Sequence, residues 1–136
     1  MPKTFRRCGR AAVAVEAALV FPILFTLIFA AIEVSVVFTT FGAMQSAGRD
    51  VTRQLSINAM SQGAVAAEIR ARLPAWARDA AAISVVESTP GVPETNQIDV
   101  EIRLPADSAS PFRAFTALAT GWTLTTAVSM KQEMPL

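Results

Sequence analysis

The sequence contains no histidine and no tyrosine, and its single cysteine is Cys8. Without histidine the chain has no imidazole base, no imidazole metal ligand and no Ser-His or Cys-His pair for nucleophilic catalysis. One cysteine excludes an intrachain disulfide. The six glycines are dispersed, so no glycine-rich phosphate-binding loop is present. We therefore expect a protein that is not an enzyme, with no catalytic residues, no cofactor, no metal and no small-molecule substrate.

The sequence also has little excess of either charge. Its 12 basic and 11 acidic side chains leave a net charge of +1, and the basic residues are not interleaved with aromatic ones. Such a chain has no global field that attracts nucleic acid, so nucleic acid is not an expected partner. Asp99 and Glu101 lie beside Arg103 in an alternating segment, which indicates a self-compensated, solvated face rather than a carboxylate metal site.

Apolar residues, by contrast, are abundant. They make up 52% of the chain, and the mean hydropathy of +0.41 is high for a small soluble protein. The sixteen uncharged residues "AALVFPILFTLIFAAI" lie between Glu16 and Glu33. With its flanks this run exceeds the roughly 20 residues that a helix needs to cross hydrocarbon, and it is apolar on all sides. It predicts a transmembrane helix over residues 12–41.

Basic residues are concentrated before this helix, at Lys3, Arg6, Arg7 and Arg10. By the positive-inside rule, residues 1–11 form a basic cytoplasmic tail, and the rest of the chain lies beyond the membrane. A cleavable secretory signal is a weaker alternative. The apolar core of such a signal would be shorter than the run found here. A cut after Ala31 would also need a small residue at position 29, where this chain has Phe29.

Three residues depart from the apolar pattern of the predicted helix. Pro22 predicts a kink, because proline frees a backbone carbonyl. Glu16 lies deep in the run, where a charge costs on the order of 3 kcal/mol and needs a partner. Glu33 follows seventeen residues later, about 25 Å along a helix axis. This spacing predicts that Glu33 is an interfacial acid, reaching head groups and water at the end of the span.

Beyond the membrane, two helical patterns and then strands are expected. Apolar residues recur at steps of three or four at Met44, Ala47, Gly48, Val51, Leu55 and Ala59, and again at Val65, Ile69 and Leu73 before Pro74. These patterns predict an amphipathic helical stalk over residues 42–82. Past Ala82, apolar and polar residues alternate with a period of two, which is typical of strands. The alternation is clearest in "QIDVEIRL", and a further alternating run is "WTLTTAVSMK".

The final segment, residues 83–136, is therefore predicted to be a small β-rich head. It has about three antiparallel strands packed on helices, and a short helix marked by Phe112, Phe115 and Leu118 precedes the last strand. The predicted fold class is α+β, in which a long N-terminal transmembrane helix continues into the stalk and the head follows.

The segments "AVAVEAALVFPILFTLIFAAIEV" and "SAGRDVTRQLS" together resemble the TadE-like family, the minor pseudopilins of tight-adherence (Flp-type) pilus systems. The family pattern maps onto Val15, Glu16, Pro22 and Glu33, followed by Arg49 and Arg53. The resemblance implies a structural or assembly component of a pilus or related secretion system in the bacterial inner membrane. Its implied partners are the membrane, other pilin or pseudopilin subunits and pilus assembly proteins, and the implied head is periplasmic or enters the fibre.

The resemblance further implies cleavage by a prepilin peptidase and an assembly role for Glu16, which would pair with the N-terminal amine of a neighbouring subunit. Family spacing places the acid fifth in the product, which puts the cut between Ala11 and Ala12. The peptidase preference for glycine instead favours a cut between Gly9 and Arg10. The third alternative is an uncleaved bitopic anchor whose periplasmic head binds another protein, and all three remain open at this point.

Overall fold

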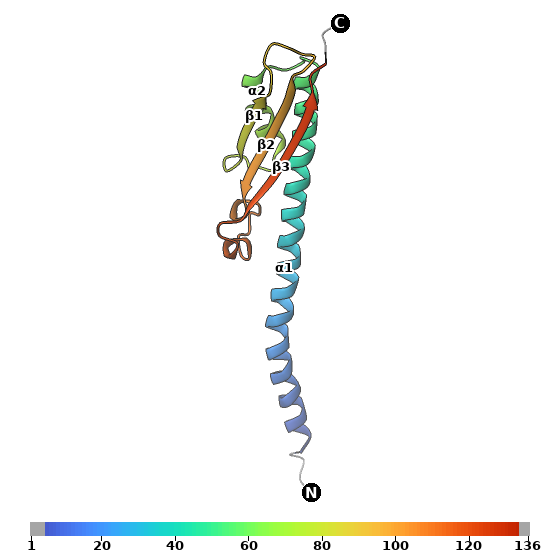
Figure 1. The fold of residues 1–136 in the computed structure, drawn as a ribbon. Helices are drawn as coiled ribbons and strands as arrows, with labels where there is room; N and C mark the ends of the chain where they lie inside the picture. The colour runs from blue at the N-terminus through green and yellow to red at the C-terminus, as the bar shows by residue number, and fades with distance from the viewer. Residues whose placement is uncertain (1–4, 134–136) are drawn as a thin grey trace. The chain divides into compact units, whose positions relative to one another are not determined.

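The computed structural model describes residues 5–133, with side chains from Ala12 onward (Figure 1). In chain order its elements are α1 (Phe5–Ser56), α2 (Gln62–Arg72), β1 (Ala82–Glu87), β2 (Gln97–Pro105), η1 (Ala106–Ser108), η2 (Thr116–Leu118) and β3 (Thr123–Lys131). The predicted α+β class, with a long N-terminal helix and a small three-stranded head, is confirmed. The chain divides into two compact units within α1, the first ending at Ile32 and the second beginning at Glu33.

The first unit is an apolar helix whose side chains are almost all exposed. The exposed large side chains are Val13, Val15, Leu19, Val20, Phe21, Ile23, Leu24, Phe25, Leu27, Ile28, Phe29 and Ile32. Among the described residues, α1 is long and apolar enough to cross a membrane, with a mean hydropathy of 2.4 in its most apolar stretch. The helix continues through Pro22, whose carbonyl accepts a hydrogen bond from the hydroxyl of Thr26 at 2.8 Å. A kink at Pro22 stays a prediction.

The second unit is built on an antiparallel sheet with β2 in the centre. Val100 of β2 lies opposite Val85 of β1 and Val128 of β3. The residues of β2 that alternate toward one face, Ile98, Val100, Ile102 and Leu104, are all buried. The strand periodicity read from the sequence is thus confirmed, and it leaves a single face of the sheet to be covered.

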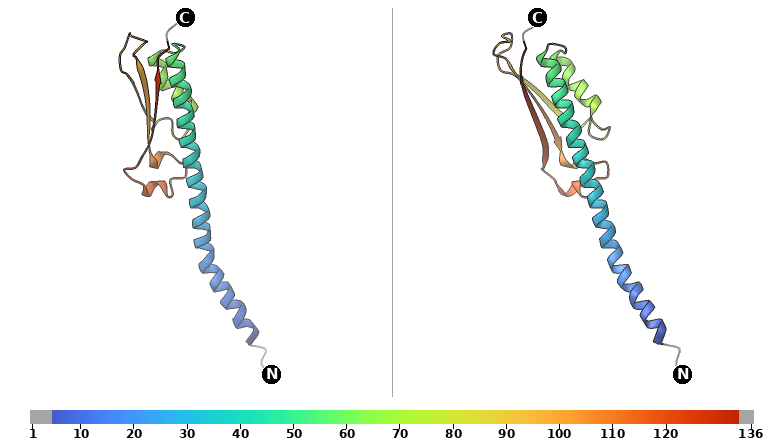
Figure 2. Two further views of the ribbon diagram at one scale, coloured as in Figure 1. Left: turned by 45° about the vertical axis from the view of Figure 1, so that its right-hand side comes forward. Right: turned by 90° about the vertical axis from the view of Figure 1, so that its right-hand side faces the viewer.

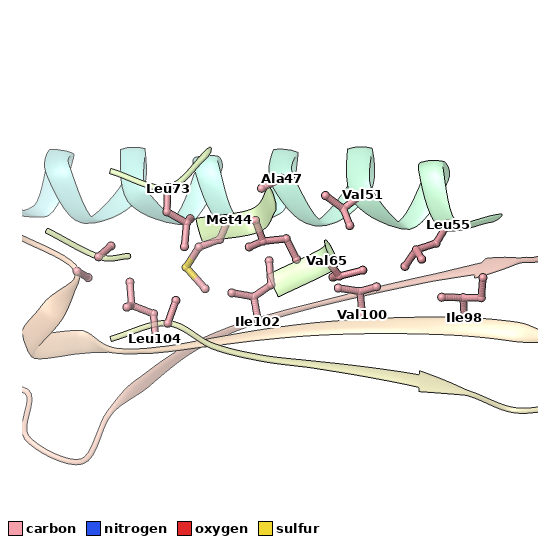
Figure 3. Packing of buried hydrophobic residues seen from close by; sticks show 14 residues of the cluster. Met44, Ala47, Val51, Leu55, Val65, Leu73, Ile98, Val100, Ile102 and Leu104 are labelled. Carbon is pink, nitrogen blue, oxygen red and sulfur yellow. The ribbon is translucent and has the colours of Figure 1, made fainter. Parts of the chain in front are cut away.

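Helices cover that face. Within the second unit, α1 and α2 lie on the same side of the sheet (Figure 2), and the apolar residues of the two helices interlock with those of β2 (Figure 3). The helical members of this core are Met44, Ala47, Val51, Leu55, Val65 and Ile69, and Leu73 directly follows α2. Each large side chain buried there stabilises the fold by about 1.5–3 kcal/mol relative to exposure.

Helix α1 ends earlier than its apolar pattern predicts. The pattern was extended to Ala59, but the helix stops at Ser56 and Ala59 is exposed. Asn58 has a positive φ of 56° and donates its backbone N–H to the carbonyl of Leu55 at 3.0 Å. Asparagine adopts this left-handed conformation more readily than most residues, so it closes the helix.

The short helix predicted around Phe112, Phe115 and Leu118 is reduced in the structure to η2, a 3₁₀ helix of three residues. Arg113 has a positive φ of 52°, which interrupts any helix through this segment. The backbone N–H groups of Phe115 and Thr116, at the N-terminus of η2, donate to the carboxylate of Glu33. Residues 106–122, which include η1 and η2, are called the β2–β3 loop below.

Candidate functional site

Glu33 is the first residue of a stripe along one side of α1. Its side chain is only 2% exposed, and Thr40, seven residues later, is fully buried. The stripe continues through Met44, Ala47 and Val51 at steps of three or four. These spacings repeat on one helix face, so Glu33 and Thr40 point toward the same neighbours as the apolar core. Glu33 thus begins the surface of α1 that packs within the second unit.

The carboxylate of Glu33 binds the β2–β3 loop through both of its oxygens. Oε2 accepts a hydrogen bond from the backbone N–H of Phe115 at 2.7 Å. Oε1 accepts two, from the backbone N–H of Thr116 at 3.1 Å and from its hydroxyl at 2.8 Å. All three partners act as donors, an arrangement that suits an ionised carboxylate. Charge-assisted bonds of this kind each contribute about 1.5–3 kcal/mol, so they offset much of the cost of burying the charge.

A second connection ties the same loop to α1. The hydroxyl of Thr40 donates to the carbonyl of Ala109 at 2.9 Å in a buried position. That carbonyl also accepts a hydrogen bond from the indole N–H of Trp76 at 3.3 Å. Within the loop, Arg113 and Asp107 form an ion pair at 2.9 Å. The two connections hold the start and the middle of the loop against positions of α1 that are about two turns apart.

The position of Glu33 at the end of the apolar run predicts a side chain that reaches head groups and water. In the structure its carboxylate instead lies inside the second unit, because the loop supplies enough donors to replace water. The signal that could have located it is the seven-residue spacing from Glu33 to Thr40, which extends the apolar stripe backward. Two of the three donors are backbone N–H groups, which every residue except proline carries and which therefore give no signal in the sequence.

The remaining predicted site residues belong to the first unit. The backbone of Gly9, Arg10 and Ala11 is helical, while their side chains lie outside those described. Ala12 and Glu16 are exposed on α1. Residues 1–4 of the predicted basic tail lie outside the described residues. Glu16 and Glu33 belong to different units of the chain.

The described acidic residues offer no grouping for metal chemistry. For these residues no cluster of three or more carboxylate, thiol or imidazole side chains has a geometry that could hold a metal ion. Glu101 is engaged by Arg103 in a bidentate ion pair, with N···O distances of 2.8 and 2.9 Å. The carboxylate of Glu33 can fix the β2–β3 loop by hydrogen bonding. Its two oxygens already accept bonds from the N–H of Phe115 and from the N–H and hydroxyl of Thr116.

Comparison with known proteins gives one match. Residues 11–53 match the model of the family described as TadE-like protein. The chain matches no curated protein and no solved structure. The matched range contains Glu16, Pro22 and Glu33, and it ends within the part of α1 that packs on the head. Over residues 11–53 this chain is similar to the TadE-like family, as the residues around its two helix acids predicted.

Proposed function

We propose that this protein is a minor pseudopilin, a non-enzymatic structural or assembly component of a tight-adherence (Flp-type) pilus or a related secretion system. The observation that carries the proposal is the TadE-like match over residues 11–53, a segment in which Glu16 is exposed on an otherwise apolar helix. A helix that is apolar on all sides requires lipid or other helices around it. A carboxylate on such a helix requires a partner that is absent from lipid.

The proposed location is the bacterial inner membrane, with residues 1–11 in the cytoplasm and the head on the periplasmic side. The support for this orientation is the accumulation of Lys3, Arg6, Arg7 and Arg10 before the apolar helix. In this orientation the tail is accessible to a prepilin peptidase on the cytoplasmic side, and the head is free to meet other fibre or assembly subunits.

The proposed partner of Glu16 is the N-terminal amine of a neighbouring subunit, released by peptidase cleavage. Among packed apolar helices, such a pair selects one register, because a shifted neighbour would leave both charges unpaired in a medium of low dielectric constant. Small residues around the acid, such as Ala14, Ala17 and Ala18, allow helices to approach closely there.

The first test is the N-terminal sequence and intact mass of the protein isolated from membranes of cells that carry their own peptidase. A chain that begins at Ala12 places Glu16 fifth and supports the proposed mechanism. A chain that begins at Arg10 supports processing with Glu16 in seventh place. A chain that retains Met1 or Pro2 contradicts processing and favours the uncleaved anchor.

The second test separates insertion from assembly. Glu16→Ala should insert into the membrane as well as the unmodified chain, or better, while its cross-linking to neighbouring pilin subunits and fibre formation are lost. Val15→Ala is the matched control, because it shortens the adjacent exposed side chain without changing charge. Normal assembly of the Glu16→Ala protein would contradict the pseudopilin mechanism and favour a simple membrane anchor.

A further inference from the structure

The β2–β3 loop exposes three large apolar side chains. Phe112 is 62% exposed, Leu118 80% and Trp122 76%. Isolated apolar residues on a protein surface are common, but three within eleven positions of one loop mark a surface that has a partner. The loop cannot turn them inward, because Glu33 and Thr40 fix its backbone at Phe115, Thr116 and Ala109.

The point of attachment places this loop next to the membrane. Glu33, which binds the loop, directly follows Ile32 in the chain, the last residue of the apolar unit. The 21 residues from Ala12 to Ile32 correspond to about 31 Å of helix, which matches the roughly 30 Å of a hydrocarbon core. If the hydrocarbon core instead extended along α1 to residue 41, Glu33 and the loop residues Asp107 and Arg113 would lie inside it, at a high cost in free energy.

The two ends of the second unit expose different kinds of side chain, and among the described residues only the end at Glu33 exposes aromatic ones suited to a membrane surface. At the far end of its α1 segment, Asn58 accepts a hydrogen bond from Gln132 at 2.6 Å, and the carbonyl of Ser56 accepts one from the N–H of Glu133 at 2.8 Å. That end presents amides and carboxylates, and its exposed large side chain beside Asn58 is the aliphatic Ile57, at 47%. The end at Glu33 presents Phe112, Leu118 and Trp122, and tryptophan and phenylalanine are side chains that favour the boundary between head groups and acyl chains.

We propose that the β2–β3 loop docks on the membrane surface, with Phe112, Leu118 and Trp122 inserted at the boundary between head groups and acyl chains. The loop is neutral overall, because its two charged residues, Asp107 and Arg113, pair with each other. Docking is therefore driven by apolar burial, and it holds the head in one orientation on the bilayer. This inference rests on the membrane anchoring proposed above.

Tryptophan fluorescence tests the docking, since the chain has only two tryptophans, Trp76 and Trp122. The full chain is placed in phosphatidylcholine vesicles brominated near the head-group end of the acyl chains. In Trp76→Phe, the emission of Trp122 should shift to the blue relative to exposed tryptophan and lose most of its intensity to bromine. Trp122→Phe is the matched control, and the emission of its remaining Trp76 should keep its intensity.

Subtracting the Trp122→Phe emission from that of the unmodified chain isolates Trp122 without altering the bond from Trp76 to Ala109. Unquenched Trp122 in a chain that floats with the vesicles overturns the docking but leaves the anchoring intact. A chain that does not float overturns the anchoring and the docking with it. If Trp122 is shielded from water only when each vesicle holds several copies of the chain, its partner is a second copy of the chain, and the proposal that it contacts lipid is overturned.

Discussion

The carboxylate of Glu33 accepts hydrogen bonds from the backbone N–H and the hydroxyl of Thr116, a residue 83 positions further along the chain. This contact joins the residue that follows the apolar segment to the loop before the last strand. It is a long-range interaction that closes the second unit at the end nearest the proposed membrane span. Its removal is therefore the most direct probe of how the head is held.

Glu33→Ala should release the β2–β3 loop. The substitution leaves two backbone N–H groups and one hydroxyl without their acceptor, and we expect a loss of about 3 kcal/mol in the free energy of unfolding. Hydrogen exchange of the full chain in detergent micelles should show lost protection at the amides of Phe115 and Thr116. Glu68→Ala is the control, because it removes an acid from a partly exposed ion pair on α2 and should cost no more than about 1 kcal/mol. Unchanged amide protection in Glu33→Ala would contradict this account of the loop.

Two adjacent threonines of α1 should respond differently to replacement by valine. Thr40→Val removes the buried hydrogen bond to the carbonyl of Ala109 and should cost about 1–2 kcal/mol. Thr39→Val removes an exposed bond to the carbonyl of Ser35 within the same helix and should change stability by less than about 0.5 kcal/mol. Denaturant unfolding, followed by near-ultraviolet circular dichroism, compares them. Equal effects of the two substitutions would show that the Ala109 contact is energetically unimportant.

Two glycines of α1 offer a test of how closely the helix packs on the sheet. A Cβ atom at Gly48 would lie 3.3 Å from a methyl group of Val128 and 3.6 Å from Ile102, whereas one at Gly42 would meet nothing within 4 Å. Gly42→Ala should therefore stabilise the protein by about 1 kcal/mol through helix propensity. Gly48→Leu should destabilise it by about 1–3 kcal/mol or more through overpacking, while Gly42→Leu should be tolerated. Thermal unfolding of the four proteins, including the unmodified chain, gives the comparison, and a Gly48→Leu protein as stable as Gly42→Leu would argue against the close approach.

Asn96 should prove the most sensitive residue of the loop between β1 and β2. It is 1% exposed, its side-chain carbonyl accepts from the N–H of Thr89 at 3.0 Å, and its amide donates to Gln132 at 2.8 Å. Asn96→Ala leaves these groups unpaired and should lower the free energy of unfolding by about 2–3 kcal/mol. Thr95→Ala, at the exposed neighbouring position, should change it by less than about 0.5 kcal/mol. Chemical denaturation measures both, and similar midpoints for the two variants would refute the proposed role of Asn96.

The elements with strong local periodicity were predictable from the sequence. The apolar run around Pro22 required a long helix, and alternation along β2 placed Ile98 to Leu104 on one face, because both patterns repeat with the geometry of the element itself. The pattern around Glu16 and Glu33 also predicted the TadE-like match over residues 11–53. In these segments each residue contributes to the same pattern, so no knowledge of distant contacts was needed.

Other features depended on tertiary structure. The sequence alone determined that Glu33 is an acid at the end of an apolar run, but burial of its carboxylate required the backbone N–H groups of Phe115 and Thr116, whose positions depend on how the β2–β3 loop folds back onto α1. The positive φ of Arg113 interrupts this segment, so the helix predicted around Phe112 to Leu118 is reduced to the three residues of η2. Local patterns record the period of a helix or strand, whereas these contacts are decided by which donors a distant acceptor meets once the core has packed.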